Sequence, residues 1–207
     1  MEKNNRIMLV GSTGSMARYL LGMLAKTQWA HEIICVARNV EQAQKDINIH
    51  LIGAHIFGIY PKITLHQCDV NNVDQLASII AETKPDVVMN CTREVAGVKY
   101  GPTSIKHLDD AYGGWTVFAL TLSYKVAVAV KLSGHPTKLI NSSYSDVICP
   151  ALDQMPECAK IWSGIGNLGH VVPRIRLSAS KLFEMDPEDL DVRLVASHLH
   201  EIGRAHV

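Results

Sequence analysis

The sequence lacks an excess of charge of either sign. Its 207 residues include 20 basic and 20 acidic side chains, so the formal net charge is zero with histidine neutral. The chain has no overall field to attract nucleic acid or an anionic membrane, and we expect neither as a partner. Charged residues make up 19% of the chain and apolar residues 47%, which excludes an intrinsically disordered protein. We expect one large domain with a sizeable buried core.

Long apolar runs are also absent. The apolar segment 126–130 is bounded by Lys125 and Lys131 and is far shorter than the ~20 residues that cross a bilayer. The polar N-terminal segment leads directly into a strand-like run, so we expect no signal peptide. These features predict a protein without a membrane span.

The cysteines and histidines lack the spacings of disulfide frameworks and metal sites. The five cysteines are odd in number and contain no C-x-x-C pair. Cys35, Cys68 and Cys91 lie in or beside strand-like segments, where a thiol serves as a small apolar filler. The spacing of the histidines does not indicate a metal site. We therefore expect no metal, and a reducing, cytoplasmic location.

What the sequence does contain is an alternation of strand-like and helix-like segments. Short apolar runs typical of buried strands occupy 6–10, 32–36, 63–66, 85–90, 138–141, 160–163 and 191–196. Helical patterns lie at 16–25, 40–56, 73–82, 114–132, within 147–158 and at 172–184, with Asn71 or Asn72 as the cap of the third. A long loop is expected at 92–109. The alternation predicts an α/β fold with a doubly wound, mostly parallel sheet and ligand-binding loops at the carboxyl ends of the strands.

A glycine-containing turn, Gly11-Ser-Thr-Gly-Ser-Met-Ala17, connects the first predicted strand to the first helix. Glycine lets the backbone turn sharply and approach a pyrophosphate, while the helix start presents free N–H groups and a positive dipole. The strand–turn–helix context therefore predicts a Rossmann-type dinucleotide-binding domain over residues 1–145. The expected cofactor-binding residues of the turn are Gly11, Ser12, Thr13, Gly14, Ser15 and Met16.

Three further segments bear on the cofactor. No carboxylate ends the second strand, where one would bind the ribose 2′-hydroxyl of NAD; Arg38 is there instead. Arg38 could pair with a 2′-phosphate, which favours NADP over NAD, or could be a solvated surface charge. After the third strand, Asp69 could accept a hydrogen bond from the adenine amino group with Val70 against the ring, or could only shape the loop. After the fourth strand, Cys91 and Thr92 are expected to line the ribose and diphosphate.

The second half adds three segments: KLINSSYSDV at 138–147, GIGNLGHVVPRIR at 164–176 and DPEDLDVRLVASH at 186–198. With the glycine turn, their order resembles the L-lactate/L-malate dehydrogenase family. The gap of 24 residues from Arg174 to His198 matches that family's substrate arginine and catalytic histidine.

The resemblance implies an enzyme, an NAD(P)-dependent oxidoreductase that transfers a hydride between nicotinamide and a small 2-hydroxy or 2-oxo acid. His198 would be the general acid/base, with His200 as the alternative, because histidine titrates near neutral pH. Arg174, or Arg176 in its place, would bind the substrate carboxylate. Asn141 would bind both cofactor and substrate, near the nicotinamide. Relatives are often dimers or tetramers, so a homo-oligomer is expected.

Departures from that family favour a second hypothesis. The family's aspartate, which orients the histidine, corresponds to Val171 here. Family members also continue beyond the point where this sequence stops, so we expect residues 146–207 to be the start of a truncated substrate region. A non-catalytic NADP(H)-binding or sensing protein therefore stays open.

A third hypothesis is an atypical relative of the short-chain dehydrogenases. These share the glycine turn and the Asp-Val after the third strand, but their catalysis needs a Tyr-x-x-x-Lys pair. The fourth residue after Tyr144 is Ile148, and the fourth after Tyr124 is Val128. Their usual chemistry is therefore disfavoured.

Overall fold

The computed structural model describes residues 5–93, 116–143, 147–165 and 168–194. The chain divides into two compact units, Met1–Gly164 and Ile165–Val207. The second unit contains α7 (Leu168–Phe183) and the short 3-10 helix η2 (Pro187–Asp189). The whole sheet belongs to the first unit. The functional division predicted at residue 145 stays a prediction, because compactness does not tell which part holds a substrate.

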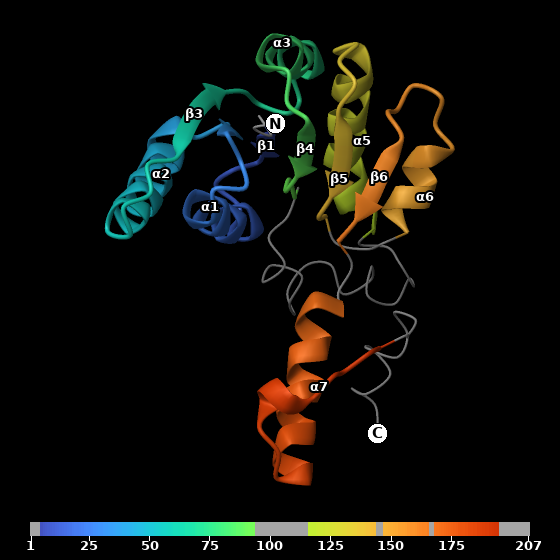
Figure 1. Ribbon diagram of the computed structural model, residues 1–207. Coiled ribbons are helices and arrows are strands. Elements are labelled where there is room, and N and C mark those ends of the chain that lie inside the picture. The colour runs from blue at the N-terminus through green and yellow to red at the C-terminus, as the bar shows by residue number, and fades with distance from the viewer. Residues whose placement is uncertain (1–4, 94–115, 144–146, 166–167, 195–207) are drawn as a thin grey trace, which may run out of the picture. The chain divides into compact units, whose positions relative to one another are not determined.

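Six parallel strands form one sheet in the order β3-β2-β1-β4-β5-β6 (Figure 1). The strands are β1 (Arg6–Val10), β2 (Glu32–Ala37), β3 (Lys62–Gln67), β4 (Val87–Asn90), β5 (Lys138–Asn141) and β6 (Ile161–Gly164). The chain builds outward from β1 to β3, then crosses to β4 and builds the other way. The boundary between β1 and β4 is therefore the topological switch point. The predicted doubly wound α/β fold is confirmed.

Helices cover both faces of the sheet. Leu9 packs in a cluster with buried residues of α1 (Ser15–Thr27) and α2 (Val40–His55). Its neighbours Met8 and Val10 point the other way, into a cluster with α3 (Val73–Thr83), α5 (Thr116–Leu132) and α6 (Ile148–Asp153). Because both faces are buried, the central strands have continuous rather than alternating apolar sequences.

Local signals place the helix starts close to where the sequence predicts them. The Asn39 side chain accepts a hydrogen bond from the Gln42 N–H at 3.0 Å and caps α2. Of the two candidate caps for α3, Asn72 is the one used, accepting from the Gln75 N–H at 3.1 Å. Each cap satisfies a main-chain donor that the first helical turn would leave unpaired.

One predicted strand is wrong where it can be examined. Residues 191–194 form no strand, and the rest of the predicted strand 191–196 lies outside the described residues. The apolar alternation there is strand-like, but a strand also needs a neighbour to accept its main-chain hydrogen bonds. No described residue of the second unit forms such a neighbour. The predicted helix 172–184 begins earlier, at Leu168, and contains Pro173.

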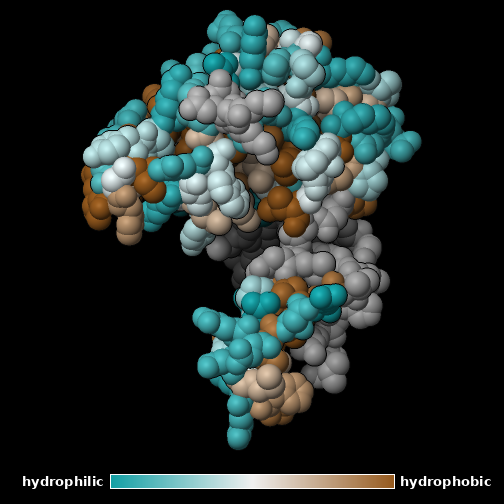
Figure 2. All heavy atoms as spheres, viewed as in Figure 1, coloured by the Kyte–Doolittle hydropathy of each residue, from teal (hydrophilic) through white to brown (hydrophobic). Residues whose placement is uncertain are grey.

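The outer face of α2 leaves large apolar side chains exposed. Ile49, Ile52 and Ile56 follow a helical spacing and all lie in contact with solvent. Figure 2 shows hydrophobic atoms gathered at the surface in this region.

The predicted homo-oligomer stays a prediction. None of the helices in the described part of the chain has both the length and the hydropathy to cross a membrane.

Candidate functional site

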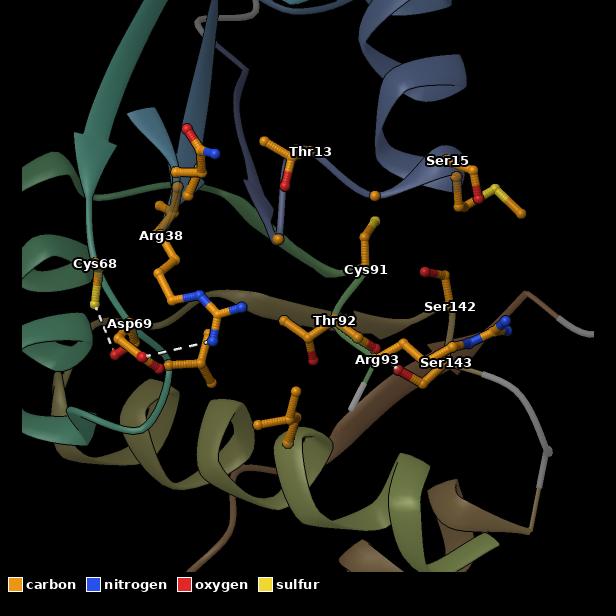
Figure 3. A pocket seen from close by; sticks show the side chains of 18 of the residues that line it. Thr13, Ser15, Arg38, Cys68, Asp69, Cys91, Thr92, Arg93, Ser142 and Ser143 are labelled. Atoms are coloured by element: carbon orange, nitrogen blue, oxygen red, sulfur yellow. Dashed lines mark hydrogen bonds and ion pairs between the residues drawn. The ribbon is translucent and has the colours of Figure 1, made fainter. Parts of the chain in front are cut away.

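A cavity of about 760 Å³ opens at the carboxyl ends of β1 to β5 (Figure 3). Its volume lies within the range of small-molecule and cofactor sites. It spans the switch point between β1 and β4, which is where doubly wound sheets bind ligands. The lining residues come from the end of β2, the loops after the five strands, the start of α1 and the middle of α5: Gly11, Thr13, Gly14, Ser15, Met16, Val36, Ala37, Arg38, Asn39, Cys68, Asp69, Val70, Asn71, Cys91, Thr92, Arg93, Leu122, Ser142 and Ser143.

The glycine turn is folded tightly against the ends of β2 and β4. The N–H groups of Gly11 and Ser12 both donate to the Val36 carbonyl at 3.0 Å, and Gly14 N–H donates to the Gly11 carbonyl at 2.9 Å. Gly11 has a φ of +81°, which other residues rarely adopt. A side chain there would also meet Thr92, with a Cβ only 3.1 Å from the Thr92 Cγ2 and 3.2 Å from its main chain. Only glycine therefore suits this position.

The remaining main-chain donors of the turn belong to residues that line the cavity. Thr13, Ser15 and Met16 line the cavity, and within the described residues no acceptor pairs with their main-chain N–H groups. The α1 N-cap is Gly14, which offers no side-chain acceptor, and the first turn of α1 contains no acidic residue. The partial positive charge of the helix start is therefore not neutralised locally. This arrangement fits a phosphate group.

Close approach of the backbone also explains Gly14. Its own φ is an ordinary −68°. A Cβ there would lie 3.2 Å from the Gly11 carbonyl oxygen and 3.3 Å from the Cys91 carbonyl oxygen. A larger residue would push the turn away from the end of β4 and disturb the cradle that the turn forms.

At the β2–β3 end of the cavity, Arg38 and Asp69 face each other (Figure 3). The Arg38 side chain is 81% exposed, and its Nη1 lies 3.9 Å from Asp69 Oδ2. The other carboxylate oxygen, Oδ1, accepts from the Asn71 N–H at 2.9 Å and from the Asn71 side chain at 2.8 Å. Asp69 therefore shapes its loop, as one of the two alternatives predicts. It also lines the cavity with Val70, so adenine binding stays a prediction.

Most of the predicted cofactor-binding residues surround this one cavity, and two do not line it. Ser12 is buried beneath the turn. Asn141 is only 3% exposed, and its Oδ1 accepts from Asn90 Nδ2 at 2.8 Å. The predicted role of Asn141 in binding cofactor and substrate stays a prediction, and in this structure its side chain contacts Asn90.

Sequence reasoning missed several residues of the site. Ser142 and Ser143 line the cavity directly after β5, and Asn90 lies buried beneath its floor. The signal for the two serines was present, because both follow a predicted strand on the edge where ligand loops gather. Asn90 carries a similar signal, since it ends the predicted fourth strand, but the partners of its buried side chain could not be read from the sequence.

Of the predicted catalytic residues, only Arg174 lies within the described part of the chain. Arg174 is exposed on α7 in the second unit, Arg176 is half-buried on the same helix, and Val171 is half-buried. His198, His200 and Tyr144 lie outside the described residues. The pairing of Arg174 with a histidine therefore stays a prediction.

The thiols near the cavity are unsuited to nucleophilic chemistry. Burial raises the pKa of the Cys91 thiol to about 11 and that of the Cys35 thiol to about 12. Both groups are therefore protonated at neutral pH, and a protonated thiol is a weak nucleophile and metal ligand. Among the residues described, no group of three or more His, Cys, Asp or Glu could hold a metal ion.

A family model matches most of the first unit. The model described as "NAD dependent epimerase/dehydratase family" covers residues 7–136, from β1 through the end of α5. A comparison with curated proteins found no match.

Solved structures share the fold at low identity. Malate dehydrogenase from Picrophilus torridus superposes with a TM-score of 0.72 and 17% identity, covering 95% of this chain and 56% of its own. The minor L-lactate dehydrogenase from Enterococcus mundtii superposes with a TM-score of 0.65 and 14% identity, covering 94% of this chain and 55% of its own. Lactate dehydrogenase from Cryptosporidium parvum superposes with a TM-score of 0.64 and 15% identity, covering 92% of this chain and 54% of its own. That structure is complexed with lactic acid and nicotinamide adenine dinucleotide. The chain spans about half the length of these proteins.

Proposed function

Because this chain belongs to the NAD dependent epimerase/dehydratase family, we propose that its cavity binds a nicotinamide dinucleotide and that the chain serves an oxidoreductase reaction. The diphosphate would lie on the glycine turn. The adenosine would lie over β2 and β3, and the nicotinamide would lie over β4 and β5. When bound, the dinucleotide supplies a carbon that accepts or releases a hydride.

One observation carries the binding proposal. Thr13, Ser15 and Met16 line the cavity, and their N–H groups lack acceptors in the described part of the chain. They belong to a helix start without a nearby carboxylate in its first turn. A diphosphate would accept from these donors and would be stabilised by the helix dipole.

The side chain of Arg38 supports NADP as the preferred form. Its guanidinium is exposed at the rim of the cavity, at the end of β2, where it could meet a ribose 2′-phosphate. No carboxylate occupies the β2 end to receive a 2′-hydroxyl, and Asp69 reaches Arg38 only at 3.9 Å. A phosphate at hydrogen-bond distance would bind the guanidinium more strongly than this long, solvated contact.

For the reaction, we propose hydride transfer to or from a small 2-hydroxy or 2-oxo acid. The spacing of Arg174 and His198, and the fold shared with malate and lactate dehydrogenases, support this substrate class. Arg174 would hold the carboxylate, and His198, or His200 two residues on, would carry the proton that accompanies the hydride.

A specific observation favours a second candidate function. Val171 occupies the position where a carboxylate would orient the histidine and stabilise its cation. A protein that binds NADP(H) without turnover would need no such carboxylate, so a binding or sensing role is the alternative.

Two measurements on the unmodified chain test these proposals. Fluorescence titration with NADPH and NADH should show saturable binding, tighter for NADPH; no binding of either would refute the cofactor proposal. Absorbance at the nicotinamide band, followed with a panel of 2-hydroxy and 2-oxo acids, should show turnover that Arg174→Ala abolishes while NADPH binding persists. Binding without turnover on any acid would select the binding or sensing role.

A further inference from the structure

A network of buried polar side chains lies directly beneath the cavity floor, at the ends of β4 and β5. Its centre is Asn90, the last residue of β4, which is only 2% exposed. Asn90 pairs in the sheet register with Asn141, the last residue of β5. Its Nδ2 lies 2.8 Å from Asn141 Oδ1, 3.0 Å from Ser123 Oγ and 3.3 Å from Ser143 Oγ. Its Oδ1 accepts from the Thr92 N–H at 3.1 Å and from the Thr92 hydroxyl at 2.7 Å.

The direction of these hydrogen bonds is determined by the surrounding groups. The main-chain N–H of Thr92 can only donate, so the Asn90 atom that faces it must be the oxygen. On the other side, the Ser123 hydroxyl donates to the Ala119 carbonyl at 2.8 Å, and the Ser143 hydroxyl donates to the Thr92 carbonyl at 2.7 Å. Both hydroxyl protons are therefore committed elsewhere, and both oxygens are left to accept from the Asn90 amide.

The network demands an amide at position 90 in particular. An amide offers a two-lone-pair acceptor on one side and two donors on the other, which matches the two donors and the acceptors that face it. A carboxylate of the same shape would place an oxygen against the acceptors of Asn141, Ser123 and Ser143. Because the group is buried, these repulsive contacts would not be relieved by water.

Asn90 also organises the main chain of the two loops that line the cavity. Its carbonyl accepts from the Ser142 N–H at 3.0 Å and from the Ser142 hydroxyl at 2.7 Å. Thr92, Ser142 and Ser143 all line the cavity. The Thr92 backbone in turn is the surface on which Gly11 packs. One buried residue thus connects the β4 loop, the β5 loop and the glycine turn.

We propose that Asn90 is a positioning residue that shapes the floor beneath the nicotinamide half of the bound dinucleotide. The inference rests on the proposed function. Arg38 and Asp69 lie on the β2–β3 side of the glycine turn, and Thr92, Ser142 and Ser143 lie on the β4–β5 side. With the 2′-phosphate at Arg38 and the diphosphate at the turn, the nicotinamide half must extend over the loops that Asn90 holds.

This division of the cavity supplies a test that separates positioning from general stability. Full dinucleotides, NADPH and NADH, occupy both halves of the cavity. Their adenosine halves, adenosine 2′,5′-bisphosphate and ADP, reach only the turn and the β2–β3 side. A defect in the floor should therefore weaken the binding of the full dinucleotides and leave the binding of the half-ligands unchanged.

The experiment compares Asn90→Asp and Ser123→Ala in the whole chain with Val126→Ala as the control; Ser123 is a buried member of the network that does not line the cavity. Val126 is fully buried in the core on α5 and forms none of the network's hydrogen bonds, so its truncation is expected to lower stability without changing them. Dissociation constants are measured by fluorescence for the dinucleotides and by calorimetry for the half-ligands. We expect both network variants to bind NADPH and NADH about tenfold more weakly, which is the effect of losing one buried hydrogen-bond partner. The dissociation constants of the half-ligands should change by less than about twofold. Val126→Ala should alter the binding of neither the dinucleotides nor the half-ligands.

Other results would overturn the inference. Equal weakening of dinucleotides and half-ligands would show that Asn90 only holds the fold together, and unchanged NADPH binding in a folded variant would show that the floor is not shaped by it. If Asn90→Asp does not fold, Ser123→Ala decides alone, since it removes a hydroxyl that accepts from Asn90 and Ser123 does not line the cavity. A failure of the unmodified chain to bind any dinucleotide would appear before any variant is made, and would refute the proposed function and this inference together.

Discussion

Replacing Gly11 by alanine tests the geometry of the glycine turn most directly. Two costs combine at this position. The φ of +81° lies in the left-handed region, which costs an L-residue about 1–2 kcal/mol. The new Cβ would also lie 3.1–3.2 Å from three atoms of Thr92, two of them main-chain atoms. Crowding of this kind in a packed site costs about 1–3 kcal/mol.

Gly58 provides a matched control for the first cost. Its φ is +71°, and a Cβ there would meet nothing within 4 Å. Gly58→Ala therefore carries the left-handed penalty without the crowding. For a chain of this size each kcal/mol lowers the melting temperature by about 2–4 °C. We expect a fall of about 2–8 °C for Gly58→Ala and about 4–20 °C for Gly11→Ala.

The assay is thermal unfolding followed by circular dichroism, paired with NADPH titration at a temperature where both variants are folded. Gly11→Ala should bind NADPH markedly less tightly, because the turn must shift away from Thr92, while Gly58→Ala should bind normally. If Gly11→Ala were no less stable than Gly58→Ala and bound NADPH equally well, the close packing of the turn on Thr92 would not matter and the reasoning would be wrong.

Three further outcomes are expected. Arg38→Ala should weaken NADPH by about 10- to 100-fold and NADH by less than about twofold, because only the 2′-phosphate meets the guanidinium; equal losses in fluorescence titrations would contradict the assignment. Burial lowers the pKa of His50 below its ordinary 6.5, so on acidification the unfolded chain takes up this proton before the folded chain does. The stability that the neutral His50 gives the folded chain is complete above about pH 6.5 and is lost as the pH falls. His50→Gln should flatten this acid-side decline in melts between about pH 5 and 8, and an unchanged profile would exclude His50 as its source. Burial raises the pKa of the Cys91 thiol to about 11, so its alkylation by iodoacetamide at about pH 8 should be slow by mass spectrometry and should accelerate in mild denaturant; rapid labelling of the native protein would contradict the burial.

Much of the fold could be predicted because its signals are local. The strands around β1 and β2 are short apolar runs, and burial on both faces requires that composition wherever a parallel sheet forms. The glycine turn was recognisable because its chemistry depends on adjacent residues of one segment. The strand predicted at 191–196 was wrong in the part described, since its sequence was suitable but a hydrogen-bonding neighbour was lacking.

The candidate site was only partly predictable. Arg38 and Asp69 were identified separately, from the ends of their strands, but their approach to 3.9 Å depends on the pairing of β2 with β3. For Asn141, a role in binding the ligand followed only from the resemblance to the lactate and malate dehydrogenases, and it stays a prediction. Its hydrogen bond with Asn90 could not be predicted, because it depends on the pairing of β4 with β5.

By itself, the sequence determined the succession of strands and helices, the glycine turn at the head of α1 and the absence of a carboxylate after β2, since each is a property of consecutive residues. Only the tertiary structure decided which polar groups meet beneath the cavity. The three acceptors that face the Asn90 amide group are 33, 51 and 53 residues away along the chain. They become neighbours because β5 lies beside β4 and α5 covers that face of the sheet, and chain-distant contacts of this kind leave no mark on local sequence pattern.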